Sequence, residues 1–227
     1  MTTIKSVVGT VLFTSDKPLK EALEEAVKGS VYLNHAQLAD ADLRGANLSG
    51  ADLRFADLTN ADLKHANLAG ANLMYAKLAG ANLKGAKLYV ANFRRTDLAG
   101  ADLAGADLTT VNAASAMFNG ADLSGANLED AYLENSEFRA ANFAGANLDG
   151  ANLAYADLHK ADLSGANLEE AVLRCANLKG ANLANAEGDY FNLEGANLSH
   201  ANLAGVELVS AIVQLASFTP ETLKGAT

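Results

Sequence analysis

The side chains best suited to acid–base or nucleophilic chemistry are scattered along this sequence. The 227 residues include four histidines and one cysteine, Cys175. A catalytic histidine needs a hydroxyl, thiol or carboxylate within hydrogen-bonding reach, and a zinc site needs Cys or His ligands at short spacings. His65, His159 and His200 fall at outward positions with no matching Ser, Cys or acid cluster at catalytic spacing, and Arg174 is the only charged neighbour of Cys175. No glycine-rich phosphate loop is present, so the sequence predicts no enzymatic activity, cofactor or metal site.

Acidic side chains are the most abundant chemical feature, with 27 Asp and Glu against 17 Lys and Arg and a net charge of −10. Direct nucleic-acid binding requires clustered Lys and Arg and is not predicted. A protein partner that is basic or binds DNA itself suits the charge better. The single cysteine cannot form an internal disulfide, which suits a reducing cytoplasm. The chain starts MTTIKSVVGTVLFTSD, without the apolar run of a signal peptide, and no 18-residue apolar run follows, so we expect a cytoplasmic protein without a membrane segment.

A strict five-residue spacing must position these side chains. In residues 161–183, ADLSGANLEEAVLRCANLKGANL, leucine returns at every fifth position and alanine always stands two residues before it. A helix would rotate successive leucines by about 140° and spread them around its surface. A strand would alternate them between its two faces. A chain that turns a corner every five residues directs all of them to one axis, so the spacing predicts a solenoid.

The register runs without insertion from Leu33 to Phe218, over 38 central positions, of which 30 are Leu and five are Phe. Of the 38 positions two residues earlier, 32 are Ala, and neither set contains a charged residue. Units such as ADLRG, ANLSG and ANLEE resemble the pentapeptide-repeat family, with its motif A(D/N)LXX, over about four-fifths of the chain. The resemblance implies an all-β solenoid, a right-handed quadrilateral β-helix with twenty residues per coil. The spacing of five alone leaves the number of sides open.

Two irregular repeats are expected to be repacked. Ala113 replaces a central Leu, and Val111 replaces the Ala beside it. Gly188 leaves a larger gap, and Phe191 follows at an Ala position. Because voids in a close-packed core are costly, we expect the larger neighbours to fill the lost volume. A ligand pocket at Gly188 is the alternative.

We expect an N-terminal cap over residues 1–30, a β-helix over 31–218 and a tail or short capping helix over 219–227. In the cap, 4–13 is predicted to be a strand, and a helix is predicted to begin near Pro18, capped by Ser15 or Asp16, and to end at Gly29. Such a cap covers the first coil and prevents end-to-end stacking. Docking of a partner on the helix is the alternative. The apolar stripe of the helix consists of Leu19, Ala22, Leu23, Ala26 and Val27.

Outward positions near the C-terminus become apolar at Val209, Ile212 and Leu215, where earlier repeats carry polar or small residues. Exposed apolar groups that gather in this way indicate an interface. The tail can cover them as a helix with Thr219 as N-cap and Pro220 at its first position. Alternatively, two chains meet there in a two-fold homodimer, as in some relatives of the family.

Most of the charge falls on one face when outward residues are sorted at twenty per coil. We call the face centred on Leu48, Leu68 and so on to Leu208 the acidic face. It carries nine acids and one base, Lys87, or −8 of the net charge. The nine are Asp107, Glu129, Asp130, Asp149, Glu169, Glu170, Glu187, Asp189 and Glu207.

The other faces carry less charge. The opposite face is close to neutral, and an adjacent face, centred on Leu53, sums to about +1. One corner column of this adjacent face contains Phe55, Tyr75, Arg95 and Tyr155. Aromatic and arginine side chains are enriched at binding hot spots, so the column is either a contact strip or a stack that shields the corner.

The acidic face therefore predicts a non-catalytic protein-interaction or scaffold module. The alternative, implied by family members that resemble DNA, is an inhibitor or protector of a type II topoisomerase such as gyrase. Nine charges over six coil levels amount to about one per 3 Å, against about one per 1.7 Å along DNA. The loop insertions of one gyrase-protecting group are missing from this sequence. The candidate partner-binding residues are Glu129, Asp130, Asp149, Glu169, Glu170, Glu187, Asp189 and Glu207.

Overall fold

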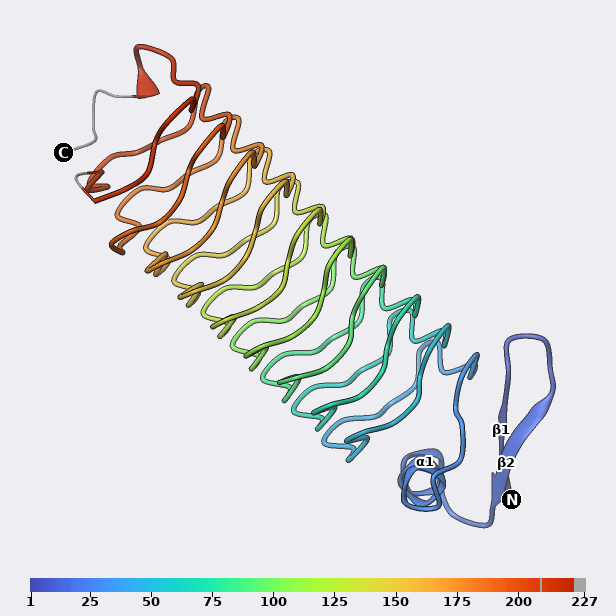
Figure 1. Cartoon of the computed structure of the whole chain (residues 1–227). Coiled ribbons are helices and arrows are strands. Elements are labelled where there is room, and N and C mark those ends of the chain that lie inside the picture. Colours follow the sequence, from blue (N-terminus) through green and yellow to red (C-terminus); the bar gives the residue numbers. More distant parts are fainter. Residues whose placement is uncertain (209, 223–227) are drawn as a thin grey trace.

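The computed structural model describes residues 1–208 and 210–222, which form a straight stack of coils with the N-terminal segment at one end (Figure 1). Parallel bridges join residues one coil apart, such as Asn47 to Asn67 and Asn67 to Lys87, a step of twenty residues. The Leu48 amide donates to the Asn67 carbonyl at 2.8 Å, and the Asn67 amide donates to the Ala46 carbonyl at 2.8 Å. Since the chain bends every five residues, each coil has four sides.

Each corner is a tight turn whose third residue has a left-handed backbone. In the turn from Leu43 to Ala46, the Ala46 amide donates to the Leu43 carbonyl at 3.0 Å, and Gly45 has φ of 64°. A positive φ at this position alone is the pattern of a type II turn. Where Asp or Asn stands before the central Leu, as in most repeats, its side chain supports the corner; Asp122 Oδ1, for example, accepts the Ser124 amide at 3.0 Å. The motif A(D/N)LXX thus encodes both the core and the bend.

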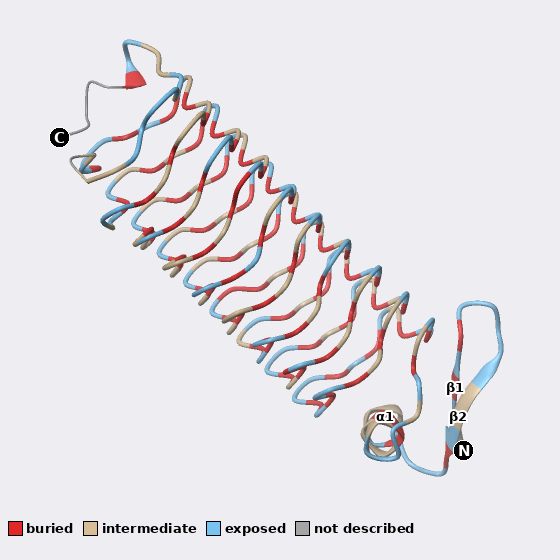
Figure 2. Ribbon diagram, viewed as in Figure 1, coloured by how far each residue is buried: buried red, intermediate tan, exposed pale blue. Residues whose placement is uncertain are grey.

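The inward positions form one continuous apolar core, seen as the red inner segments of each coil in Figure 2. Leucines such as Leu48 and Leu53 are fully buried. Two polar residues in the alanine column are satisfied by carbonyls of the preceding coil. Thr96 Oγ1 donates to Leu73 O at 2.7 Å, and Ser136 Oγ donates to Ala113 O at 2.8 Å. Among the described residues, no buried side-chain N or O atom lacks a hydrogen-bond partner.

The irregular repeats are repacked in two ways. Val111 and Ala113 are fully buried, as is Phe191, which agrees with the expected exchange of volume. At Gly188 the main chain also departs from the regular repeat, with φ of 133°, and it lies against the preceding coil. A Cβ there would overlap the main chain of Leu168 and Glu169 in the preceding coil. This backbone conformation at Gly188 was not predicted from the sequence.

The N-terminal segment begins with a hairpin. Strand β1 (Thr2–Lys5) pairs antiparallel with β2 (Val11–Ser15). The prediction of one strand over residues 4–13 was therefore wrong, because the chain reverses direction near Gly9, whose φ is 86°. The Lys5 carbonyl accepts the Gln37 amide at 2.8 Å, so β1 occupies the place of a preceding coil along one side.

Helix α1 (Leu19–Lys28) closes the end of the core. Its N-cap is Pro18 and it has no side-chain capping bond, so the predicted cap at Ser15 or Asp16 was wrong. Ser15 Oγ instead donates to the Glu25 carboxylate at 2.8 Å. The predicted apolar stripe faces the first coil. Its buried members are Ala22, Leu23 and Ala26, and its partly buried members are Leu19 and Val27.

The other end of the stack leaves apolar groups exposed. Ile212 is 44% exposed, and Leu215 is 86% exposed at a corner with φ of 59°. Thr222 is buried, and its hydroxyl lies 2.7 Å from the Thr219 hydroxyl and 3.2 Å from the Leu198 carbonyl oxygen. Val209 and most of the helix predicted for the tail, residues 223–227, lie outside the described residues.

Candidate functional site

Four carboxylates form a column on the acidic face. Glu129, Asp149 and Glu169 occupy the second position of the corner turn in three successive coils, and Asp189 takes the equivalent place in the next coil, at the irregular corner after Gly188. Neighbouring coils are about 4.8 Å apart, the spacing of paired strands. We call these four residues the acidic column. It could be predicted once the coil length was known, because its members are twenty residues apart.

A ladder of asparagine side chains holds the acidic column in register. Asn147 Nδ2 donates to Asn127 Oδ1 at 2.9 Å, and Asn167 Nδ2 donates to Asn147 Oδ1 at 2.9 Å. Each of these oxygens also accepts the backbone amide of the acidic residue two positions on, at 3.3 Å for Glu129 and Asp149. The carboxylates therefore project from a fixed backbone.

The remaining predicted residues lie around this column. Asp130 and Glu170 follow at the exposed corners. Glu187, Glu207 and two members of the column, Glu169 and Asp189, line an open hollow of about 390 Å³ beside Gly188. A ligand pocket at Gly188 was the alternative to repacking, and the structure has this open hollow at that place. Its Glu169 carboxylate accepts the Asp189 amide at 2.7 Å.

Carboxylates on the acidic face have no cationic partner within 4.0 Å among the described residues. On other faces, some acids pair with neighbouring bases. Hydrogen bonds from Arg44 lower the pKa of Asp42 to about 2, and a hydrogen bond from Arg54 lowers the pKa of Asp52. The acids with an ion-pair partner are Glu25, Asp42, Asp52, Asp62 and Asp157. Other faces also carry unpaired acids, but the acidic face gathers the most, nine acids against one base, Lys87.

Three of the four residues predicted for the corner column, Phe55, Tyr75 and Arg95, form a continuous stack that also includes His35. The fourth, Tyr155, lies three coils beyond Arg95, with Ser115 and Asn135 between them in the column. The rings of His35 and Phe55 lie 4.9 Å apart at 7°, and those of Phe55 and Tyr75 lie 5.0 Å apart at 5°. The Arg95 guanidinium follows, 5.7 Å from the Tyr75 centroid. We call these four residues the corner stack. Because each ring covers its neighbour, only ring edges face outward. The sequence analysis missed His35, although its distance of twenty residues from Phe55 would have revealed it.

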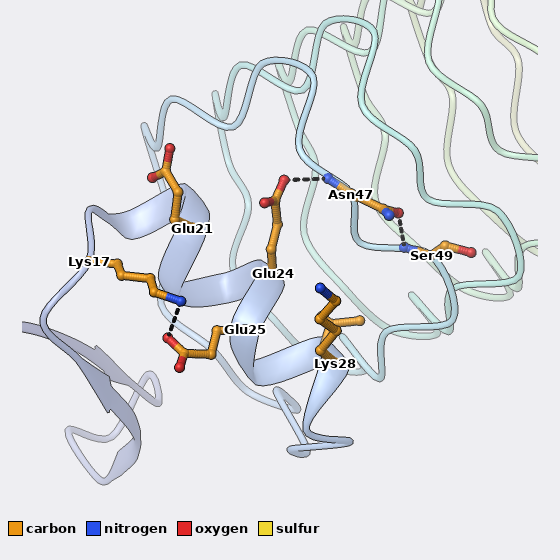
Figure 3. A pocket seen from close by; sticks show the side chains of 8 residues that line it. Lys17, Glu21, Glu24, Glu25, Lys28, Asn47 and Ser49 are labelled. Atoms are coloured by element: carbon orange, nitrogen blue, oxygen red, sulfur yellow. Dashed lines mark hydrogen bonds and ion pairs between the residues drawn. The ribbon is translucent and has the colours of Figure 1, made fainter.

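Another hollow lies between helix α1 and the first coil, and Figure 3 shows its side chains. It measures about 720 Å³ and contains mixed charges, including a Lys17–Glu25 ion pair at 3.3 Å. Glu24 Oε1 accepts the Asn47 amide at 2.9 Å. In later coils a backbone carbonyl accepts this amide, so Glu24 replaces the missing coil. These contacts join the cap to the solenoid.

The side chains considered first for catalysis remain dispersed. Cys175 is an exposed free cysteine. Within residues 1–208 and 210–222, no group of three or more His, Cys, Asp or Glu is arranged to hold a metal ion. No helix in the same part of the chain is long and apolar enough to cross a membrane.

Comparison with known proteins identifies the family. The model for pentapeptide repeats matches eight copies within residues 30–89, 91–187 and 190–219. The chain therefore belongs to the pentapeptide repeat family, and its fold is the right-handed quadrilateral β-helix of that family, with a small strand and helix cap. No match was found among the curated proteins compared.

Several solved structures are similar. HetL of the cyanobacterium Nostoc, a pentapeptide repeat protein involved in the regulation of heterocyst differentiation, is 30% identical with a TM-score of 0.41; the match covers 91% of this chain and 95% of HetL. A trypsin-treated variant of QnrB1, a plasmid-mediated fluoroquinolone resistance protein, is 20% identical with a TM-score of 0.36, over 82% of this chain and 88% of QnrB1. A pentapeptide repeat protein of the Arabidopsis thaliana thylakoid lumen is 32% identical with a TM-score of 0.17, over 50% and 69% of the two chains.

Proposed function

We propose that this chain is a non-catalytic, cytoplasmic protein-interaction module whose acidic face binds a basic protein partner. The observation that carries the proposal is the acidic column, four carboxylates stacked in successive coils without a cation within 4.0 Å among the described residues. Acids elsewhere on the rod are spread over the other faces, and some of them, such as Asp42 and Asp52, pair with a neighbouring arginine. A partner that brings Lys or Arg side chains to this face would supply the missing counter-charge.

Electrostatic repulsion within the acidic column supports this proposal. Two carboxylates about 4.8 Å apart repel each other by on the order of 1 kcal/mol in water before salt screening. Each inner member of the column has two such neighbours. Cationic side chains of a partner would offset this repulsion, because each cation is attracted to the carboxylates on either side of it. A continuous negative face also accelerates encounter with a basic protein at low salt.

Charge reversal tests the proposal. We expect Glu129→Lys combined with Glu169→Lys to remove partners recovered from a lysate by the wild-type chain, and the recovery by the wild type to fall as salt is raised. The matched control is Glu134→Lys combined with Glu194→Lys, which makes the same charge change at the same turn position on an adjacent face. If both double variants recover the wild-type set of partners, the acidic face is only a solvated surface.

The second candidate is a DNA-mimicking inhibitor or protector of a type II topoisomerase. Its specific support is the linear charge density of the acidic face, about one charge per 3 Å, or roughly half that of duplex DNA. A relative of the same family, QnrB1, is a fluoroquinolone resistance protein. A supercoiling assay with purified gyrase tests this candidate directly. Unchanged supercoiling and unchanged quinolone sensitivity at tens of micromolar of this chain would rule it out.

A further inference from the structure

The corner stack ends at Arg95. The Arg95 guanidinium covers the Tyr75 ring and donates to the Tyr75 hydroxyl oxygen at 2.9 Å. The next residue of the same column is Ser115, whose side chain is too short to continue the stack. Among the described residues, the guanidinium has no stacking partner on the side that faces Ser115. The column therefore contains an unfilled position.

An open hollow of about 430 Å³ lies beside this unfilled position. Arg94 lines one side of it and Tyr132 lines another, with Asn112 and Ala114 between them. Tyr132 is 52% exposed. The hollow exists because the repeat at 111–115, VNAAS, directs only small side chains outward. An aromatic side chain from another molecule can enter here without displacing a large group.

Arg94, which lines the hollow, and Arg95 beside it outnumber the one lining acid, Glu134, so the charges here sum to +1. Neither Arg94 nor Arg95 has a carboxylate within 4.0 Å among the described residues. The one acid that lines the hollow is Glu134, whose Oε1 accepts a hydrogen bond from Asn152 Nδ2 at 2.6 Å. Arg and Tyr are also the residue types most enriched at the energetic centres of protein interfaces.

We propose that this hollow, together with Arg95 and Ser115 at the adjoining corner, binds an acidic peptide segment of a partner protein that carries an aromatic side chain. The aromatic ring lies on the uncovered face of the Arg95 guanidinium as the fifth member of the corner stack, and a neighbouring carboxylate pairs with Arg94. Aromatic members of the stack lie 4.9–5.0 Å apart, which is the spacing expected for the added ring. The site is on a different face from the acidic column, so it does not depend on the function proposed above.

The test uses the absence of tryptophan from this chain. The probe is the synthetic peptide Gly-Gly-Asp-Glu-Trp-Asp-Glu-Gly-Gly, whose tryptophan emission reports its own binding. We expect saturable binding to the wild type, and binding at least about tenfold weaker to Arg94→Gln and to Arg95→Gln. Arg174→Gln is the matched control, because it removes the same charge from an arginine 5.0 Å from the Tyr155 ring on the same face. This control should bind as the wild type does.

A second variant fills the position instead of removing a contact. Ser115 has φ of 60°, close to 58° at Phe55 and 61° at Tyr75, so this backbone already accepts aromatic side chains in the same column. We expect Ser115→Phe to abolish probe binding and to raise the melting temperature, and Ser115→Ala to bind as the wild type does.

Three results would overturn the proposal. The first is the absence of saturable binding to the wild type, and the second is equal affinity of the Arg95→Gln and Arg174→Gln variants. The third is undiminished binding to Ser115→Phe. A peptide with Asn and Gln in place of the acids should bind at least about tenfold more weakly. Equal affinity for that peptide would also contradict the proposed carboxylate contact.

Discussion

Replacement of Gly188 by alanine is expected to destabilise the chain much more than the same replacement at an ordinary corner glycine. An added Cβ would overlap the Glu169 amide nitrogen and lie 2.6 Å from the Leu168 carbonyl carbon and 2.9 Å from Glu169 Cα. These are main-chain atoms of the preceding coil, and they cannot rotate away as a side chain would. Gly188→Ala must therefore displace a whole segment of the ladder.

The size of the effect follows from two terms. A backbone with φ near 133° is open almost only to glycine, and such strained conformations cost a residue with a Cβ about 1–3 kcal/mol. Forced overlap in a packed region adds about 1–3 kcal/mol. The matched control is Gly120→Ala, where φ is 68° and no atom lies within 4 Å of the added Cβ. The left-handed backbone alone should cost this control about 1–2 kcal/mol.

Thermal unfolding followed by circular dichroism measures the difference. We expect Gly188→Ala to lose about 3 kcal/mol more than Gly120→Ala, which lowers the melting temperature by about 6–12 °C more in a chain of this size. Because a repeat stack can open from one end, hydrogen exchange at Glu169 and Glu170 should show whether the loss begins locally. Equal melting temperatures and equal exchange in the two variants would refute the close packing of Gly188 against the main chain of the preceding coil.

Three further predictions concern the cap, pH and self-association. Glu24→Ala should speed hydrogen exchange at the Asn47 amide, which loses its acceptor at 2.9 Å, while amides of the central coils keep their rates. A hydrogen bond from Arg54 lowers the pKa of Asp52; burial raises the pKa of Asp157, but hydrogen bonds from Arg139 and other donors leave it lower overall. The stability that these carboxylates contribute is thus present above their usual pKa of about 3.8 and is lost as pH falls through the lower pKa values of the folded state. The double variant Asp52→Asn with Asp157→Asn should therefore flatten the curve of melting temperature against pH below about pH 4. If two chains meet at the C-terminal end, light scattering should detect a dimer that Leu215→Arg converts to a monomer, whereas a wild-type monomer at micromolar concentration would remove this hypothesis.

The solenoid could be predicted from the sequence because the inward positions have little freedom. A central Leu and an Ala two residues before it fill a coil of fixed size, and Asp or Asn is the usual residue between them. Thirty-eight repetitions of this constraint leave no other regular structure. The cap has no such repetition. Its hairpin depends on one residue, Gly9, with a positive φ, and a local pattern of alternating residues did not reveal it.

The charged surfaces were predictable to a lesser degree. Once a coil has twenty residues, the face of every acid follows from its number, so the acidic column could be found from spacing. The presence of cationic partners beside those acids could not be predicted from spacing, because it depends on side-chain conformations within one face. At Gly188, likewise, the sequence indicated a missing side chain, but it did not indicate that the main chain there would lie against the preceding coil.

The two proposed sites use the same property of the repeat. In the motif A(D/N)LXX, the first three residues are committed to the core and the bridge, and only the last two lie at the corner, where the backbone is held without help from their own side chains. Glu129 and Arg94 occupy the first of these corner positions, and Arg95 and Ser115 occupy the second. Side chains at these positions can therefore change with little cost to the fold. Each of them lies about 4.8 Å from the equivalent position in the coil on either side, so side chains of one kind can line up in a column. A rod built in this way can present a negative column on one face and an aromatic–arginine column on another, so recognition by either can be altered without altering the core that supports both.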